Sequence, residues 1–215
     1  MLSNIRKFEN IDYPFPEQQI LQRLGYRSGQ TLVTESSQKH LRDWLQQARA
    51  VCRPRACAGT LPVRECTADS VLLTDGTALN SRSLARFLQH AQLVWLVCIT
   101  LGEELPALSR QALDGGDGAA ALIVDAAGSE CVEAALDSLQ EFSRREFLRQ
   151  GLFLDQRRFS AGYGDWPVTD QSHFFRWFPL AEMGLRLSCA GAIEPEKTIT
   201  AIAGIRRQEG HNDPQ

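Results

Sequence analysis

The longest regular pattern in the chain is an alanine-rich stretch at residues 118–149. It contains no proline and is dominated by strong helix formers, so it predicts one helix well beyond the average of about 11–12 residues. Such a helix gains most of its stability from packing an apolar face, which requires a broad apolar surface elsewhere in the chain. Gly128, inside this helix, costs about 1 kcal/mol relative to alanine, which indicates close packing or a ligand near the backbone.

The apolar run QLVWLVCIT at residues 92–100 is the best candidate for that surface. It is of strand length, rich in β-branched residues and apolar throughout, so it predicts a strand buried on both faces. The segments RACAGTLPVRE and SVLLTDG predict a β-hairpin, and LRLS and TITAIAGI predict short strands nearer the C-terminus. Amphipathic spacing predicts two earlier helices, at residues 17–26 and 35–51.

These elements predict a single α+β domain over residues 1–215, with a mostly antiparallel central sheet wrapped by helices. Within it, residues 1–51 are expected to form a helical N-terminal part and residues 52–205 the α+β core. Residues 206–215 are expected to form a polar tail. The chain shows no internal repeat and no low-complexity linker that would indicate a second domain.

Charge and hydropathy exclude several classes of protein. The formal net charge of −3 argues against a nucleic-acid partner. No uninterrupted apolar run approaches 18 residues, so no membrane-spanning helix is expected. The opening segment MLSNIRKFENIDYPFPEQ lacks the apolar centre of a signal peptide, which predicts a cytoplasmic protein.

Cysteines and motifs give little support for metal, nucleophilic or phosphate chemistry. Cys52, Cys57 and Cys66 follow the spacing C-x4-C-x8-C, which matches no common zinc or iron–sulfur pattern. No metal site is expected, and a metal or redox role for these three thiols is the weakest hypothesis. The nucleophile-elbow, P-loop and dinucleotide-binding motifs do not occur.

The predicted long helix carries an acidic ridge. Asp125, Ser129, Glu133 and Asp137 are spaced by four residues and therefore share one face. Such a ridge can hold a cation or hydroxyl groups in a cleft. It can equally be the solvated face of a surface helix, and spacing alone favours this second interpretation.

A loop with an unusual composition follows the helix, in the segment from Arg158 to Pro167. Its glycines, proline and aromatic residues predict a fixed, irregular backbone. Tyr163 and Trp166 could pack on a planar or cationic ligand, Trp166 through a cation–π contact. Arg158 could hold a carboxylate through two parallel hydrogen bonds. The alternative is a structural loop that packs on the protein itself, and the residues do not decide between the two.

Residues 92–205 resemble a known family. The segments VCITLGEEL and DAAGSECVEAALD, the motif Arg158-x-x-x-Gly162-Tyr163 and the final P-x-x-TITAIAGI are similar to the activation domain of cobalamin-dependent methionine synthase. The similarity is closest to free-standing versions of this domain, which lack the catalytic modules.

The resemblance implies a function and roles for individual residues. It implies binding of S-adenosylmethionine, whose methyl group restores the cobalamin of a partner's corrinoid-binding module after a flavodoxin-like protein supplies an electron. The motif implies that Arg158 holds the ligand carboxylate, Gly162 lets the backbone approach the ligand, and Tyr163 lies beside the sulfonium and the corrin. Asp125 and Glu133 lie on the segment similar to the family's cleft-lining helix.

The sequence also departs from the family pattern. A tyrosine pair that follows the last strand in the full-length enzyme has no counterpart, because no aromatic residue follows Ile205. The glutamate that precedes the motif arginine is not matched, because the residues before Arg158, GLFLDQR, offer only Asp155. The histidine after Gly-Tyr is replaced by the Val168–Thr169 region. These departures support the alternative of a non-catalytic cap or assembly partner for a corrinoid methyltransferase.

Overall fold

The computed structural model describes residues 3–27 and 34–207. Its α-helices are α1 (Glu17–Arg23), α2 (Glu35–Val51), α3 (Arg82–Leu88), α4 (Glu104–Asp114), α5 (Gly118–Leu148) and α6 (Ser172–Trp177). Two short 3₁₀ helices are η1 (Val168–Gln171) and η2 (Leu180–Met183). The strands are β1 (Ser3–Phe8), β2 (Arg55–Cys66), β3 (Ser70–Leu73), β4 (Ala78–Asn80), β5 (Leu93–Thr100), β6 (Leu152–Leu154), β7 (Arg186–Leu187), β8 (Ile193–Glu194) and β9 (Thr198–Arg207).

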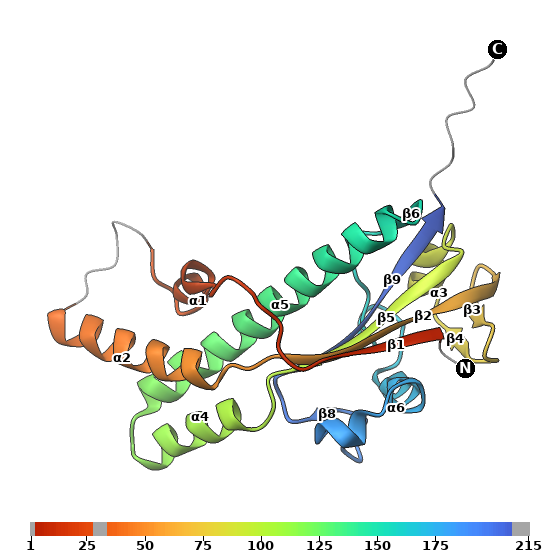
Figure 1. Ribbon diagram of the computed structural model, residues 1–215. Helices are drawn as coiled ribbons and strands as arrows, with labels where there is room; N and C mark the ends of the chain where they lie inside the picture. Colours follow the sequence, from red (N-terminus) through yellow and green to blue (C-terminus); the bar gives the residue numbers. More distant parts are fainter. Residues whose placement is uncertain (1–2, 28–33, 208–215) are drawn as a thin grey trace.

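Within the described residues, seven strands form one sheet in the order β4-β3-β2-β5-β9-β6, and β1 pairs with β2 off this path. Every one of these pairings is antiparallel. The small hairpin β7–β8 lies apart from this sheet. The α+β fold with a mostly antiparallel central sheet, predicted from the sequence, is therefore confirmed (Figure 1).

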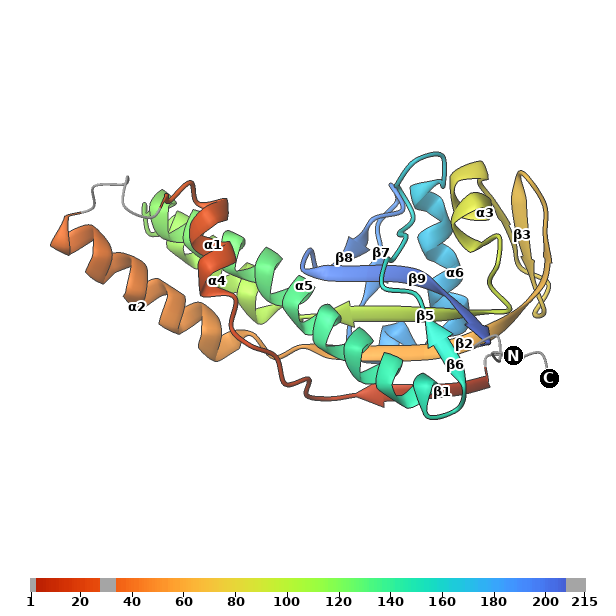
Figure 2. The same cartoon turned by 90° about the horizontal axis from the view of Figure 1, so that it is seen from above.

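Strand β5 lies at the centre of the sheet, between β2 and β9, and separates two hydrophobic cores. Trp95, Val97 and Ile99 face the core under α5, whereas Leu96 and Cys98 face the core on the opposite side. Figure 2 shows α5 on one side of the sheet and α3 and α6 on the other. Because both faces are covered, β5 is apolar at nearly every position.

Helix α5 confirms the long helix predicted from the alanine-rich stretch. Its first part packs beside α2 and α4, and its last part follows the sheet toward β6 (Figure 1). Asp117 caps its N-terminus, because the carboxylate accepts a hydrogen bond from the backbone N–H of Ala120 at 2.9 Å. Small residues on the buried face, such as Ala127 and Ala135, allow the backbone to approach its neighbours closely.

Gly128 is explained by this close approach. A β-carbon placed there would lie 2.3 Å from Cδ2 of Leu105 in α4 and 3.1 Å from the side-chain stem of Lys197. Of the two explanations offered for this glycine, close packing accounts for it within the described residues.

The N-terminal part differs from the helical segment expected over residues 1–51. Residues 3–8 form β1, which pairs with β2 through partners such as Arg6 and Ala58. A short edge strand with charged residues carries little periodic signal, so the exposed edge of β2, rather than its own sequence, determines its structure. At the other end, β9 continues to Arg207, into the expected polar tail, and residues 208–215 lie outside the described residues. In the described part of the chain, no helix is long and apolar enough to span a bilayer.

We predict that Gly128→Ala destabilises the protein by about 1–3 kcal/mol, because overpacking against Leu105 outweighs the gain in helix propensity. Urea unfolding followed by circular dichroism measures this change. The control is Gly118→Ala at the start of the same helix, where a β-carbon would meet no atom within 4 Å. If Gly128→Ala unfolds at the wild-type urea concentration or above it, the packing explanation is wrong.

Candidate functional site

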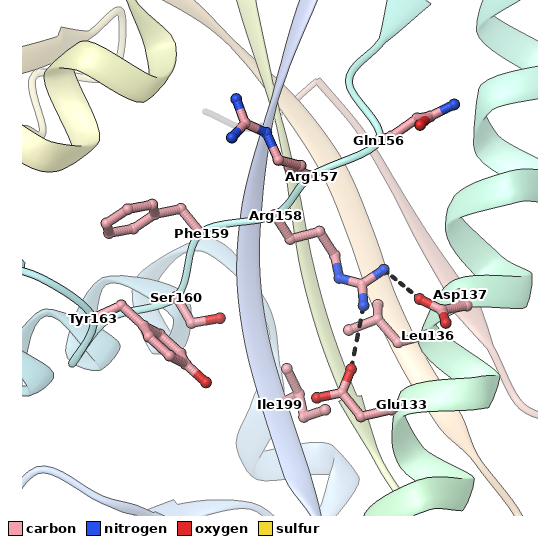
Figure 3. A pocket seen from close by; sticks show the side chains of 10 residues that line it. All are labelled: Glu133, Leu136, Asp137, Gln156, Arg157, Arg158, Phe159, Ser160, Tyr163 and Ile199. Atoms are coloured by element: carbon pink, nitrogen blue, oxygen red, sulfur yellow. Dashed lines mark hydrogen bonds and ion pairs between the residues drawn. The ribbon is translucent and has the colours of Figure 1, made fainter. Parts of the chain in front are cut away.

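A pocket of about 490 Å³ lies between α5 and the segment that leads from β6 into the loop predicted at residues 158–167. Figure 3 shows the side chains that line it. They come from α5, from the segment 156–163 and from β9: Glu133, Leu136, Asp137, Gln156, Arg157, Arg158, Phe159, Ser160, Tyr163 and Ile199. This volume falls within the range of about 300–1,000 Å³ that is typical of small-molecule sites.

Arg158 connects the two walls of the pocket. Its Nη1 donates to Oδ1 of Asp137 at 2.7 Å and also to Oε1 of Gln140, and its Nη2 donates to Oε2 of Glu133 at 3.2 Å. The Arg158 side chain is 19% exposed, whereas Glu133 and Asp137 are 51% and 68% exposed. The arginine is therefore largely buried, and its two carboxylate partners are exposed at the pocket.

Gln140 on α5 binds the backbone of the same segment. It is buried, and its amide nitrogen donates to the backbone carbonyls of Asp155 at 2.7 Å and Gln156 at 3.1 Å. The segment also runs along β9, because Asp155 N–H donates to the carbonyl of Gly204 and Phe159 exchanges hydrogen bonds with Ile202. Backbone and side-chain bonds thus hold the arginine-bearing wall in place.

Two positively charged side chains, Lys197 and Arg158, bind different parts of the acidic ridge of α5. Lys197 donates to Asp125 at 2.6 Å and to the Ser129 hydroxyl at 3.0 Å, while Arg158 binds Glu133 and Asp137. The ridge is therefore not simply a solvated helix face. Glu133 lines the pocket as the sequence suggested, whereas Asp125 does not and is paired with Lys197 instead.

The loop after Arg158 makes a tight turn. Gly162 has φ of 97°, which a residue with a side chain rarely adopts, and its N–H donates to the carbonyl of Trp166 at 2.8 Å. Tyr163 N–H donates to the carbonyl of Ser160 at 3.1 Å. Gly162 is thus required by the turn and does not line the pocket itself.

Two aromatic residues of this loop, Tyr163 and Trp166, have opposite surroundings. The Tyr163 side chain is 68% exposed at the rim of the pocket. Trp166 is 1% exposed, lies against the Phe159 ring and donates from Nε1 to Asp170 at 2.8 Å. The expected cation–π contact of Trp166 with a ligand is therefore not supported by its position, because the indole belongs to the core on the α6 side.

Asp165 anchors the loop to the start of α3. Its carboxylate accepts hydrogen bonds from the Ser81 hydroxyl at 2.6 Å and from the backbone N–H groups of Arg82 and Ser83. The Ser81 hydrogen bond, followed by the Ser83 N–H bond, holds the pKa of Asp165 well below its ordinary value of 3.8. The loop therefore depends on an ionised carboxylate outside the pocket.

Several residues of the site were not identified from the sequence. Asp137 was part of the acidic ridge but was not assigned to the site, although its spacing of four from Glu133 places both on one face. Gln140 and Lys197 carried no sequence signal, because their partners depend on how the chain folds back on α5.

The three cysteines considered for a metal or redox role lie in separate surroundings. Cys52 belongs to the core under α5, whereas Cys57 belongs to the core on the other face of the sheet, with Cys66 packed at its edge. Among residues 3–27 and 34–207, no group of three or more histidine, cysteine, aspartate or glutamate side chains is arranged to hold a metal ion.

Comparisons with known proteins identify the fold. No family model and no curated protein matches the sequence. Among solved structures, the MetH reactivation domain bound to AdoHcy matches 99% of this chain and 80% of its own chain, with a TM-score of 0.65 and 15% sequence identity. This likeness confirms the fold that the sequence resemblance implied.

We predict that Asp165→Asn makes the protein less sensitive to acid. A carboxyl group with a lowered pKa contributes stability above its ordinary value of 3.8, and this contribution is lost as the pH falls toward the folded-state pKa. The unfolding temperature of the wild type should therefore fall more steeply from pH 5 to pH 2 than that of Asp165→Asn.

The control for this measurement of unfolding temperature against pH is Asp114→Asn, at an exposed aspartate that ends α4. It should follow the wild-type dependence on pH. Identical slopes for wild type and Asp165→Asn would show that the loop does not depend on the ionised form of Asp165.

Proposed function

We propose that this protein binds S-adenosylmethionine in the pocket between α5 and the loop 156–163. We further propose that it acts in trans to reactivate a cobalamin-dependent methionine synthase. One observation supports this most strongly: Glu133, Asp137 and Arg158 lie together beside the exposed Tyr163, on the fold shared with the MetH reactivation domain bound to AdoHcy. The position of these residues agrees with the motif Arg158-x-x-x-Gly162-Tyr163.

The charges in the pocket fit those of the proposed ligand. S-adenosylmethionine has a positive sulfonium, a positive ammonium and a negative carboxylate. Glu133 and Asp137 present exposed carboxylates that attract the positive groups, and their field is only partly screened inside a pocket. A ligand with both positive groups and a carboxylate therefore matches the two carboxylates and two arginines of this pocket better than a purely anionic ligand.

Arg158 can meet the ligand carboxylate without leaving its partners. A guanidinium has five N–H donors, and three of those of Arg158 are engaged by Asp137, Gln140 and Glu133. Its remaining donors are held in direction by the rigid planar group, so little entropy is lost when a carboxylate binds. We propose that Arg158 holds the ligand carboxylate while the acidic pair orients the positive groups.

Tyr163 is the residue we assign to docking on the corrinoid. A large aromatic side chain that is 68% exposed at a pocket rim is suited to an interface, where aromatic residues contribute strongly to binding. In the proposed reaction, one electron from a flavodoxin-like protein reduces the partner's cob(II)alamin, and the ligand's methyl group then passes to cobalt, leaving S-adenosylhomocysteine. The contribution of this chain is to position the ligand.

A second function is favoured by the existing partners of Arg158. Because Glu133 and Asp137 already neutralise this arginine, the pocket is stable without a ligand. A non-catalytic cap that binds a corrinoid protein through the Tyr163 surface would need no ligand in this pocket.

We predict that Glu133→Gln weakens S-adenosylmethionine binding by about threefold to tenfold and S-adenosylhomocysteine binding by less, because only the former has the sulfonium charge. Glutamine keeps an oxygen that can accept the Arg158 hydrogen bond. Isothermal titration with both ligands measures the ratio of the two dissociation constants.

The matched control is Glu104→Gln, at an exposed glutamate on α4 that does not line the pocket. It should leave both affinities unchanged. Absence of heat with either ligand at millimolar concentration, for the wild-type protein, would contradict S-adenosylmethionine binding by this chain alone.

We predict that Tyr163→Ala lowers affinity for a cobalamin-loaded methionine synthase module by about tenfold, as expected for an exposed aromatic anchor. Biolayer interferometry against the immobilised module measures this, with Leu122→Ala as a control for an exposed apolar residue on α5. Binding that strengthens when S-adenosylmethionine is added supports reactivation. Equal affinity with and without the ligand supports the cap function.

A further inference from the structure

A second pocket, of about 480 Å³, lies on the other side of the segment 155–157. We call it the arginine pocket, because three arginines line it: Arg86 from α3, Arg157 from the segment and Arg206 from β9. The other lining residues are Phe87, Gln89, His90, Ala91, Phe153, Asp155 and Gln156. Asp155 is the only carboxylate among them, so the pocket is positively charged in a chain whose formal net charge is −3.

Aromatic rings hold two of these arginines in place. The guanidinium of Arg157 lies 6.0 Å from the centre of the Phe87 ring, and that of Arg206 lies 5.1 Å from the centre of the Phe153 ring. A ring face orients a guanidinium without neutralising its charge. Arg206 also donates to Asp155 at 3.0 Å, which leaves most of its N–H donors for other partners.

Arg157 and Arg158 are neighbours in the sequence but serve different surroundings. Figure 3 shows the Arg158 side chain directed at Glu133 and Asp137, whereas Arg157 points away from them. The acidic ridge therefore neutralises Arg158 and leaves Arg157 to the arginine pocket. Phe87 belongs to α3, so Arg157 reaches across from one element to another.

The chemistry of this pocket favours a phosphate group. A guanidinium presents its donors in a fork that matches the oxygens of phosphate, and arginine is the side chain best suited to such bidentate contacts. The volume exceeds that of a bare phosphate ion and is large enough for an organic ligand that has one. Gln156 and Arg157 line both pockets, so a ligand in the arginine pocket lies next to the candidate S-adenosylmethionine site.

We propose that the arginine pocket is a binding site for the phosphate group of a small organic ligand. Two sources have this chemistry: a free nucleotide, and the phosphodiester in the nucleotide tail of a corrinoid. The corrinoid source rests on the function proposed above, whereas phosphate binding by the pocket does not.

The first test is titration of the full chain with inorganic phosphate and AMP at constant ionic strength, followed by calorimetry. Arg86→Ala and Arg157→Ala should each weaken binding by at least about tenfold, the loss expected for one charge-assisted contact. Arg110→Ala, at an exposed arginine on α4 outside this pocket, is the matched control and should bind as the wild type does.

The second test identifies the source by comparing ligands with and without the phosphate. AMP is compared with adenosine, and cobalamin with cobinamide, which lacks the nucleotide tail. Tighter binding of AMP than adenosine, lost in Arg86→Ala, assigns the site to a nucleotide, because Arg86 lines the arginine pocket and not the candidate S-adenosylmethionine site. Tighter binding of cobalamin than cobinamide, lost in the same variant, assigns it to the corrinoid tail.

Two results would overturn the proposal. One is equal affinity within both pairs of ligands, or no saturable binding of any phosphate-bearing probe. The other is an equal response of Arg86→Ala, Arg157→Ala and Arg110→Ala, which would show a diffuse effect of charge. These results can be distinguished from failure of the proposed function, because that function is tested separately with Glu133→Gln and the two S-adenosyl ligands.

Discussion

The candidate pocket depends on the attachment of one extended segment to one long helix. Arg158 and Gln140 make this attachment from opposite sides: the arginine reaches across to carboxylates of α5, and the glutamine of α5 reaches back to the backbone carbonyls of Asp155 and Gln156. Gln140 is buried, so an unpaired amide there would cost about 1–3 kcal/mol. The position of Arg158 thus depends on Gln140, a buried residue that binds both the arginine and the backbone of its segment.

Helix α5 supplies both the core and the pocket because its two faces differ. Its buried face is rich in alanine and includes Gly128, which allows Leu105 and the stem of Lys197 to lie directly against the backbone. Its acidic ridge lies beside this face and attracts Lys197 and Arg158 from segments distant in the sequence. One face of α5 therefore packs in the core, and the acidic ridge beside it provides the charges at the pocket wall.

The sequence predicted those elements whose residues determine their own surroundings. Strand β5 was predictable because burial on both faces demands a continuous apolar run, and α5 because its length and composition exclude a strand. Strand β1 was not, since its structure comes from the edge of β2. Tyr163 and Trp166 show the same limit within one turn: composition predicted a special loop, but only the packing around Phe159 determines which ring is buried.

The consecutive arginines Arg157 and Arg158 show how one segment can serve two pockets of different charge. In extended backbone, neighbouring side chains point to opposite sides, so a shared segment presents one arginine to each. The acidic ridge lies on only one side, which makes the candidate pocket nearly balanced in charge and the arginine pocket positive. Hydrogen bonds of Asp155 and Gln156 to β9 and α5 hold the short stretch of backbone that carries both arginines. The two pockets therefore share one wall, the segment with Gln156 and Arg157, even though their charges suit different ligands.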